Sequence, residues 1–169
     1  QYALDVLGSY LTQGKKAPFY KVLVEDKKLT SNTFAYNDSQ EVAGQFALSV
    51  VAFPEKDLDD AAKAINEAFT KFEATGISEA DLKRIKAGQE TQFYNSLSSV
   101  LGKSAQLAQC NYLTGDPGCV EKEIKNILAV TTADVKRVGE KYIKGKPFVA
   151  TSFVPKGKAE LALEDSKRA

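Results

Sequence analysis

The ten-residue stretch Gly44–Phe53, GQFALSVVAF, constrains the fold more than any other part of the chain. Every second side chain in it is apolar, namely Phe46, Leu48, Val50 and Ala52. This alternation, with β-branched and aromatic residues, predicts a β-strand about 33 Å long at ~3.3 Å per residue. The apolar face needs a covering layer of helices. The opposite face, with Ala47, Ser49 and Val51, is mixed and is typical of a sheet surface turned toward another domain or a water-filled chamber.

The segments around this strand predict a small sheet. Thr33–Tyr36 is expected to be a short strand, joined by the turn NDSQE to Gly44–Phe53 as a hairpin. Gly44–Phe53 is expected to be an internal strand, and Pro147–Val154, PFVATSFV, to return to the sheet as a further strand. Because so few strands do not form an independent sheet, we also expect one strand upstream of Gln1.

Apolar residues at helical spacing predict helices before the hairpin and between it and the last strand. Capping residues, prolines and glycines mark their ends. The expected helix starts are Tyr2, Pro18, Asp57, Ser78, Leu97, Asp116-Pro117 and Thr131 or Thr132. The predicted fold is therefore a two-layer α+β domain, whose mixed or antiparallel sheet is covered on one face by helices. It spans residues 1–155, and residues 156–169 are interpreted as a charged linker or tail.

Composition excludes several classes of function. Lys and Arg number 23 against 22 Asp and Glu, so the net charge of +1 gives no field that attracts nucleic acid or an anionic membrane. No apolar run approaches the ~18–20 residues that span a bilayer. The chain has no histidine, which rules out imidazole metal sites and His-based acid–base catalysis within it. No phosphate-binding glycine loop is present either.

Two cysteines, Cys110 and Cys119, flank the turn NYLTGDPG between two predicted helices. Two alternatives remain open: two buried thiols, or a disulfide in an oxidising compartment. A disulfide closing so short a loop would contribute ~2–3 kcal/mol. The spacing is not the C-x-x-C of redox catalysis.

Several segments, in their order and spacing, resemble the pitrilysin/insulinase-type zinc peptidases, which include mitochondrial processing peptidase. The most specific are GISEADLKRIKAG and ILAVTTADVKRVGEKYI, preceded by ALDVLGSYL and PFYKVLVEDKKL. The resemblance runs from Ala3 to Pro155. It implies homologous α+β domains paired around a chamber, with zinc held by an H-x-x-E-H motif and a distal Glu in the first domain.

A chain without histidine cannot be that zinc-bearing domain. In the substrate-side half of the family, an Arg followed seven residues later by a Tyr helps to hold the peptide. The matching positions here are Val24 and Ser31, so both functional groups are lost. Tyr36 takes the place of the tyrosine only if the register shifts. The resemblance thus implies no catalytic or metal-binding residue in this chain, and zinc in a partner domain.

We therefore expect a non-catalytic domain of a zinc-dependent peptidase, which forms chamber wall and contacts both a zinc-bearing homologous domain and peptide substrate. One alternative is a scaffold without protease activity, like the inactive homologues in respiratory-complex core subunits. Another is a free-standing interaction module. Because the chain lacks methionine, we expect a piece of a longer or processed protein. A periplasmic or exported location is favoured, and a mitochondrial one is an alternative.

Overall fold

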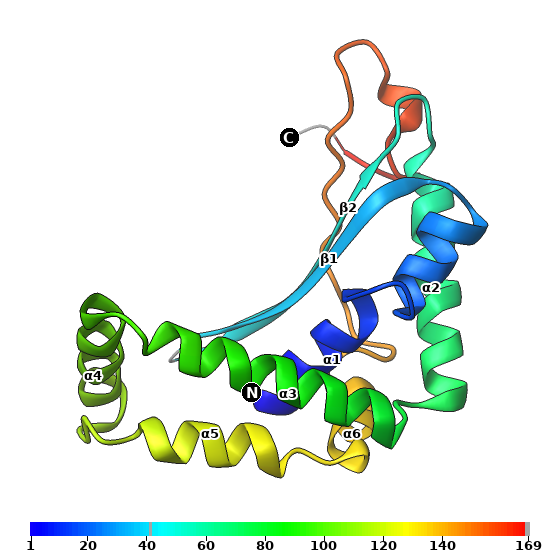
Figure 1. The fold of residues 1–169 in the computed structure, drawn as a ribbon. Coiled ribbons are helices and arrows are strands. Elements are labelled where there is room, and N and C mark those ends of the chain that lie inside the picture. Colours follow the sequence, from blue (N-terminus) through cyan, green and yellow to red (C-terminus); the bar gives the residue numbers. More distant parts are fainter. Residues whose placement is uncertain (41, 168–169) are drawn as a thin grey trace.

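The computed structural model describes residues 1–40 and 42–167 of the chain. Helices and two strands follow one another in an α+β arrangement, which confirms the predicted class (Figure 1). A π-helical segment, η1, and a 3-10 segment, η2, complete the element order. The elements are α1 (Tyr2–Thr12), η1 (Tyr20–Asp26), β1 (Thr30–Ser39), β2 (Gly44–Ala52), α2 (Leu58–Thr75), α3 (Glu79–Ser96), α4 (Val100–Thr114), α5 (Val120–Ala129), α6 (Thr132–Tyr142) and η2 (Ala159–Leu161).

The sheet is an antiparallel hairpin of β1 and β2, as the sequence predicts. Its register places Phe34 opposite Ser49 and Tyr36 opposite Ala47. β1 is ten residues long, well beyond the predicted Thr33–Tyr36. Its irregular start is fixed by the buried Thr30, whose hydroxyl donates to the carbonyl oxygen of Val51 at 2.6 Å. Residue 41, in the predicted turn, lies outside the described residues.

Helices cover one face of the hairpin. A Cβ added at Gly8 of α1 would lie 3.1 Å from the carbonyl oxygen of Ala35, so glycine lets the helix approach the strand closely. Phe46, Leu48 and Val50 of β2 pack against the core from the same side, as predicted. Fully buried side chains form the centre of this core: Val6, Leu7, Leu11, Phe19, Val22, Leu23 and Val135.

Most helix ends follow the predicted signals. The Ser78 hydroxyl accepts the N–H of Asp81 at the start of α3. Thr131 caps α6 in a reciprocal capping box with Asp134. Gly115 ends α4 in the left-handed conformation, at φ 69°, which glycine adopts without a steric penalty.

Two predicted helix starts are wrong. α4 begins at Val100, because the hydroxyl of Ser99 accepts the N–H of Gly102. α5 begins at Val120, not at Pro117. The Asp116 carboxylate accepts the N–H of Gly118 at 2.9 Å and closes a turn before the helix.

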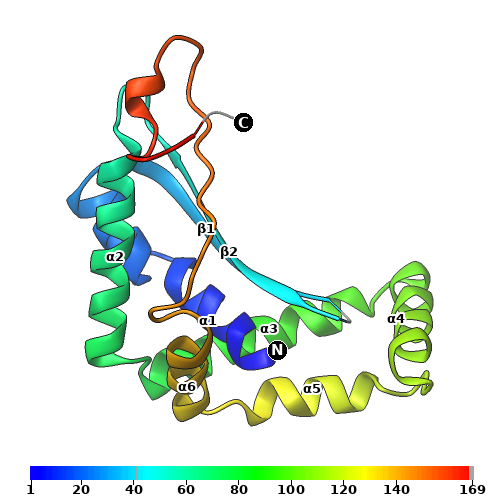
Figure 2. The same ribbon diagram turned by 180° about the vertical axis from the view of Figure 1, so that it is seen from behind.

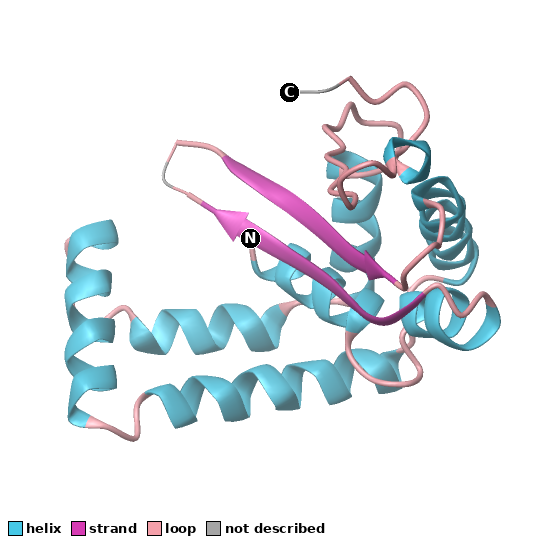
Figure 3. Ribbon diagram, turned by 90° about the horizontal axis from the view of Figure 1, so that it is seen from above, coloured by secondary structure: helices cyan, strands magenta, loops and turns pink. Residues whose placement is uncertain are grey.

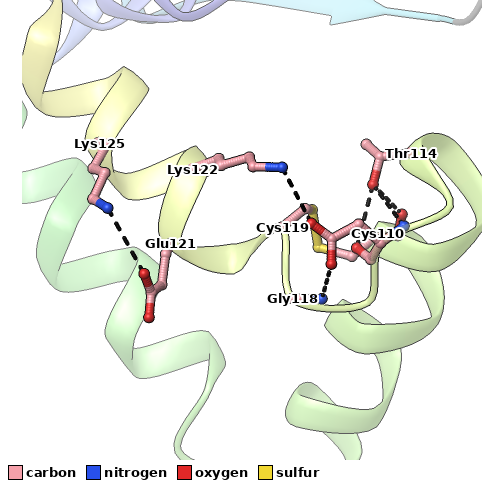
Figure 4. A network of polar contacts seen from close by, with 8 residues as sticks. Cys110, Thr114, Gly118, Cys119, Glu121, Lys122 and Lys125 are labelled. Carbon is pink, nitrogen blue, oxygen red and sulfur yellow. Dashed lines mark hydrogen bonds and ion pairs between the residues drawn. A yellow bond between two sulfur atoms is a disulfide. The ribbon is translucent and has the colours of Figure 1, made fainter.

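The corner between α4 and α5 is closed by a disulfide between Cys110 and Cys119, one of the two arrangements that the sequence leaves open (Figure 4). Their Cα atoms are 5.5 Å apart, within the range that a disulfide needs. Both cysteines are buried. Lys122 of α5 reaches back to the Asp116 carboxylate, with 3.2 Å between Nζ and Oδ2, and lowers the pKa of that group.

Two expectations about the sheet are wrong. Pro147–Val154 is extended but forms no strand, and within the described residues β2 pairs with β1 alone, so it is an edge strand (Figure 2). Extended backbone becomes a strand only when a neighbour accepts and donates its hydrogen bonds. In the described part of the chain, no such neighbour lies beside the outer edge of β2.

The C-terminal segment turns back toward α2 after residue 155. Its backbone N–H at Glu164 donates to the Asp59 carboxylate at 2.9 Å, and η2 is its one regular turn among the described residues. Residues 168–169 of the predicted tail lie outside the described residues. Within residues 1–40 and 42–167, none of the helices is both long enough and apolar enough to cross a membrane.

Candidate functional site

The face of the hairpin that points away from α1 is uncovered (Figure 3). Phe34, Tyr36 and Val51 are 51%, 53% and 70% exposed. The register sets the two aromatic residues beside the small side chains of Ser49 and Ala47. We call this surface the open face, defined by Phe34, Tyr36, Ala47, Ser49 and Val51. It contains the mixed side of Gly44–Phe53 that the sequence predicts to contact another domain.

Successive side chains of β1 point to opposite faces of the hairpin, which explains why the rings of Phe34 and Tyr36 point outward. Thr33 is buried on the helix side, and Asn37 points the same way, donating from Nδ2 to the Asp5 carboxylate of α1 at 2.9 Å. Residues 34 and 36 between them must therefore point to the opposite side. Burial raises the pKa of Asp5, and the hydrogen bond from Asn37 partly offsets that shift. This carboxylate fastens α1 to β1.

The open face offers surface for contact rather than for acid–base chemistry. Its members supply two aromatic rings, aliphatic groups and hydroxyls, and no carboxylate, imidazole or thiol. Among the described residues there is no cluster of three or more His, Cys, Asp or Glu able to hold a metal ion. The pKa of the Asp134 carboxyl is lowered to about 2 by its hydrogen bonds with Thr131 and Arg137 at the start of α6, so this group serves as a helix cap.

A groove of about 1650 Å³ runs along the outer edge of β2. Every residue from Gly44 to Phe53 lines one side of it, and residues 147–151 and 153–155 line the other. Side chains of α2, including Ile65 and Phe69, contribute to its lining. Phe148 and Phe153 are 86% and 92% exposed there, so the groove is bordered by uncovered apolar side chains.

The residues that the resemblance singles out lie at the start of the hairpin. Val24 is half buried in η1, and Ser31 is exposed at the irregular start of β1. Tyr36 lies further along β1 on the open face. From the sequence, no role is assigned to Phe34. Its position on the open face follows from the strand register, which pairs Phe34 with Ser49 and which the sequence pattern alone does not specify.

The chain therefore combines an α+β fold, an uncovered sheet face with two aromatic side chains, and a sequence without histidine. The family model described as the Peptidase M16 inactive domain matches residues 1–89, more than half of the chain. The chain belongs to this pitrilysin-type family, as an inactive peptidase domain, which confirms the resemblance found in the sequence.

Known relatives place the same domain within larger proteins. The zinc protease PqqE of Helicobacter pylori is 25% identical over 144 residues, 85% of this chain and 32% of PqqE, so the chain spans about a third of that relative. The crystal structure of a protease from Helicobacter pylori matches with TM-score 0.71 and 26% identity, over 85% of this chain and 34% of that one. The periplasmic protease PqqL from Escherichia coli shares the fold, with TM-score 0.66, 18% identity, and coverage of 84% and 15%.

Proposed function

We propose that this chain is the non-catalytic domain of a zinc-dependent peptidase, and that its open face forms part of a chamber wall and contacts a zinc-bearing homologous domain. The proposal rests mainly on one observation. The rings of Phe34 and Tyr36 are each about half exposed and lie beside small side chains on an uncovered sheet face. Apolar surface of this kind is costly to leave in water and usually marks an interaction site.

The shape of the open face supports a polypeptide partner. Ala47 and Ser49 project little, so a neighbouring backbone can approach β2 closely, while the adjacent rings of Phe34 and Tyr36 supply contact area. Aromatic residues are enriched at the centres of protein interfaces for this reason. The same surface can therefore contact a second domain and an extended peptide substrate within the chamber.

Zinc, in this proposal, belongs to the partner domain, as in the peptidases that the chain resembles. The inactive domain contributes a wall, and the chemistry takes place opposite it. The buried Cys110–Cys119 disulfide supports an oxidising location. The likeness to a periplasmic protease, PqqL, supports the periplasm or an exported location.

The experiment is made in the natural polypeptide that contains this chain. Ser49→Glu places a charge on the open face and should reduce peptide cleavage or the assembly of the two domains, while zinc content stays unchanged. Asn126→Glu, an exposed change on α5, is the matched control and should alter neither. Normal cleavage and assembly in the Ser49→Glu protein would refute the role of the open face.

A scaffold role is the second candidate, and one observation favours it. Val24 and Ser31 stand where the family carries the peptide-holding Arg and Tyr. A domain that has lost both groups can keep the fold and the domain contacts without serving proteolysis. The zinc content of the purified natural polypeptide separates the two candidates: stoichiometric zinc with peptide cleavage supports the peptidase, and neither of them supports the scaffold.

A further inference from the structure

Helix α4 stands at the end of the molecule opposite α2, and most of its surface is exposed (Figure 1). Two attachments hold one side of it against α5. Cys110 is bonded to Cys119, and Gln106 donates from Nε2 to the Glu123 carboxylate at 2.6 Å. Of the 15 residues of α4, Cys110 is the one that is buried in the described part of the chain. The side of the helix that faces away from α5 is therefore free for a further contact.

Four side chains form a narrow stripe along this exposed side of α4. We call it the α4 stripe, and its members are Leu101, Ala105, Ala108 and Tyr112. They share one face because an α-helix turns by about 100° per residue, and Cys110 lies about 170° around the helix from the centre of that face. Leu101 and Tyr112 are 79% and 78% exposed, and both alanines are exposed as well. The stripe thus points directly away from the disulfide and from α5.

Charge is almost absent from α4, although the helix is exposed. Lys103 is the one charged residue in its sequence, and it projects from the same side as Cys110, about 20° away around the helix. Val100 and Leu107 on one flank of the stripe, and Leu113 on the other, are about half exposed or more. An exposed helix normally carries charged residues on its solvent side. An apolar surface without charge is instead typical of the centre of a protein interface.

The α4 stripe is complementary to a second copy of itself. Its members are separated by four, three and four residues, a spacing that is the same when read from either end. If two such helices pack antiparallel, Leu101 of each copy meets Tyr112 of the other, and Ala105 of each meets Ala108 of the other. The large side chains then lie at the two ends of the contact. The small alanines lie at its centre, where they let the two backbones approach closely.

We propose that the α4 stripe is a self-association surface, at which two copies of this chain pack their α4 helices antiparallel about a twofold axis. Such a contact uses the same surface patch on both copies. It brings no like charges together, because Lys103 projects from the other side of the helix. It also sets the positive end of each helix dipole beside the negative end of the other. A helix of 15 residues is about 22 Å long, so the contact is small and the dimer should dissociate in the micromolar range.

The disulfide determines which side of α4 is presented to the second copy. Cys110 lies opposite the stripe and is bonded to Cys119 at the start of α5, so the stripe is held facing outward. The proposal does not depend on the chamber role, because the stripe belongs to α4 and the open face belongs to the hairpin.

Sedimentation equilibrium of the natural polypeptide that contains this chain tests the proposal by charge rescue. Ala105→Lys and Ala108→Glu each bury an unpaired charge at the centre of the contact, and each should raise the dissociation constant by about tenfold or more. Both positions are exposed and helical, and lysine and glutamate are good helix formers, so the variants should fold. The double variant sets each new lysine against a glutamate of the other copy and should recover most of the lost association. Lys103→Gln, on the far side of α4, is the matched control and should associate like the wild type.

The pattern among these variants identifies what covers the stripe. A wild-type protein that does not associate would mean that another part of the same polypeptide, or a different protein, covers it. Association that neither single variant weakens would place the contact between copies elsewhere. Weakening in both single variants without recovery in the double variant would exclude the antiparallel pairing. Each of these three results overturns the proposal.

Discussion

Replacing Cys110 and Cys119 together by alanine should loosen the corner between α4 and α5 and leave the core folded. The two cysteines are nine residues apart in sequence. For a loop of that size the chain-entropy model gives a loss of about 8.7 cal/mol/K, or about 2.6 kcal/mol at 25 °C. Alanine is the better replacement, because both sites are buried and a serine hydroxyl would need a partner there.

The loss of stability should be confined to the region of α4, because this helix has few tertiary contacts besides the disulfide. Of its 15 residues, Cys110 is the one that is buried among the described residues. Val100 and Leu101 are 83% and 79% exposed, so tertiary packing contributes little to this helix. Without the disulfide, α4 should open separately from the core, at a free energy far below that of global unfolding.

Amide hydrogen exchange measures the free energy of the local opening of α4, and urea unfolding measures the free energy of global unfolding. The amides of α4 should exchange about 70-fold faster in the double variant if the full ~2.6 kcal/mol is lost in that helix, since 1.4 kcal/mol is a factor of ten. Amides of the buried Leu7 and Val135 should change much less. Wild-type protein reduced with a thiol is the control for the substitutions themselves. Equal acceleration in α4 and in the core, or none in α4, would refute the reasoning.

Four further changes test the packing and the caps by urea or thermal unfolding. Gly8→Ala should destabilise the domain by ~1–3 kcal/mol, because the new Cβ would lie 3.1 Å from the β1 backbone. As a control, Gly88→Ala in the exposed part of α3, where a Cβ would have nothing within 4 Å, should stabilise the domain by ~0.5–1 kcal/mol. A loss of stability in both would contradict the packing at α1. Leu48→Ala should cost ~1–2 kcal/mol, below the ~2–5 kcal/mol of a fully buried leucine, because Leu48 is only half buried; a larger loss would mean that another segment covers it. Asp134 has its pKa lowered to about 2 by bonds from Thr131 and Arg137, so the stability it provides is present above pH ~4 and lost as the pH falls toward 2. Asp134→Asn should flatten that dependence in thermal unfolding followed from pH 5 to pH 2, and an unchanged profile would contradict the assignment.

Local signals predicted the helices and one face of the sheet well. Ser78 and Thr131 cap helices because their hydroxyls satisfy free N–H groups within three residues, an interaction that the sequence alone contains. The apolar face of β2 meets the core for a similarly local reason, since alternation fixes which side chains share a face. These features need no knowledge of distant segments.

Strand pairing could not be predicted in the same way. Whether Pro147–Val154 becomes a strand depends on a partner far away in sequence, and alternation does not identify that partner. The error at Asp116-Pro117 is smaller and local. An aspartate before proline can cap a helix or close a turn, and here the N–H of Gly118 competes successfully for the carboxylate.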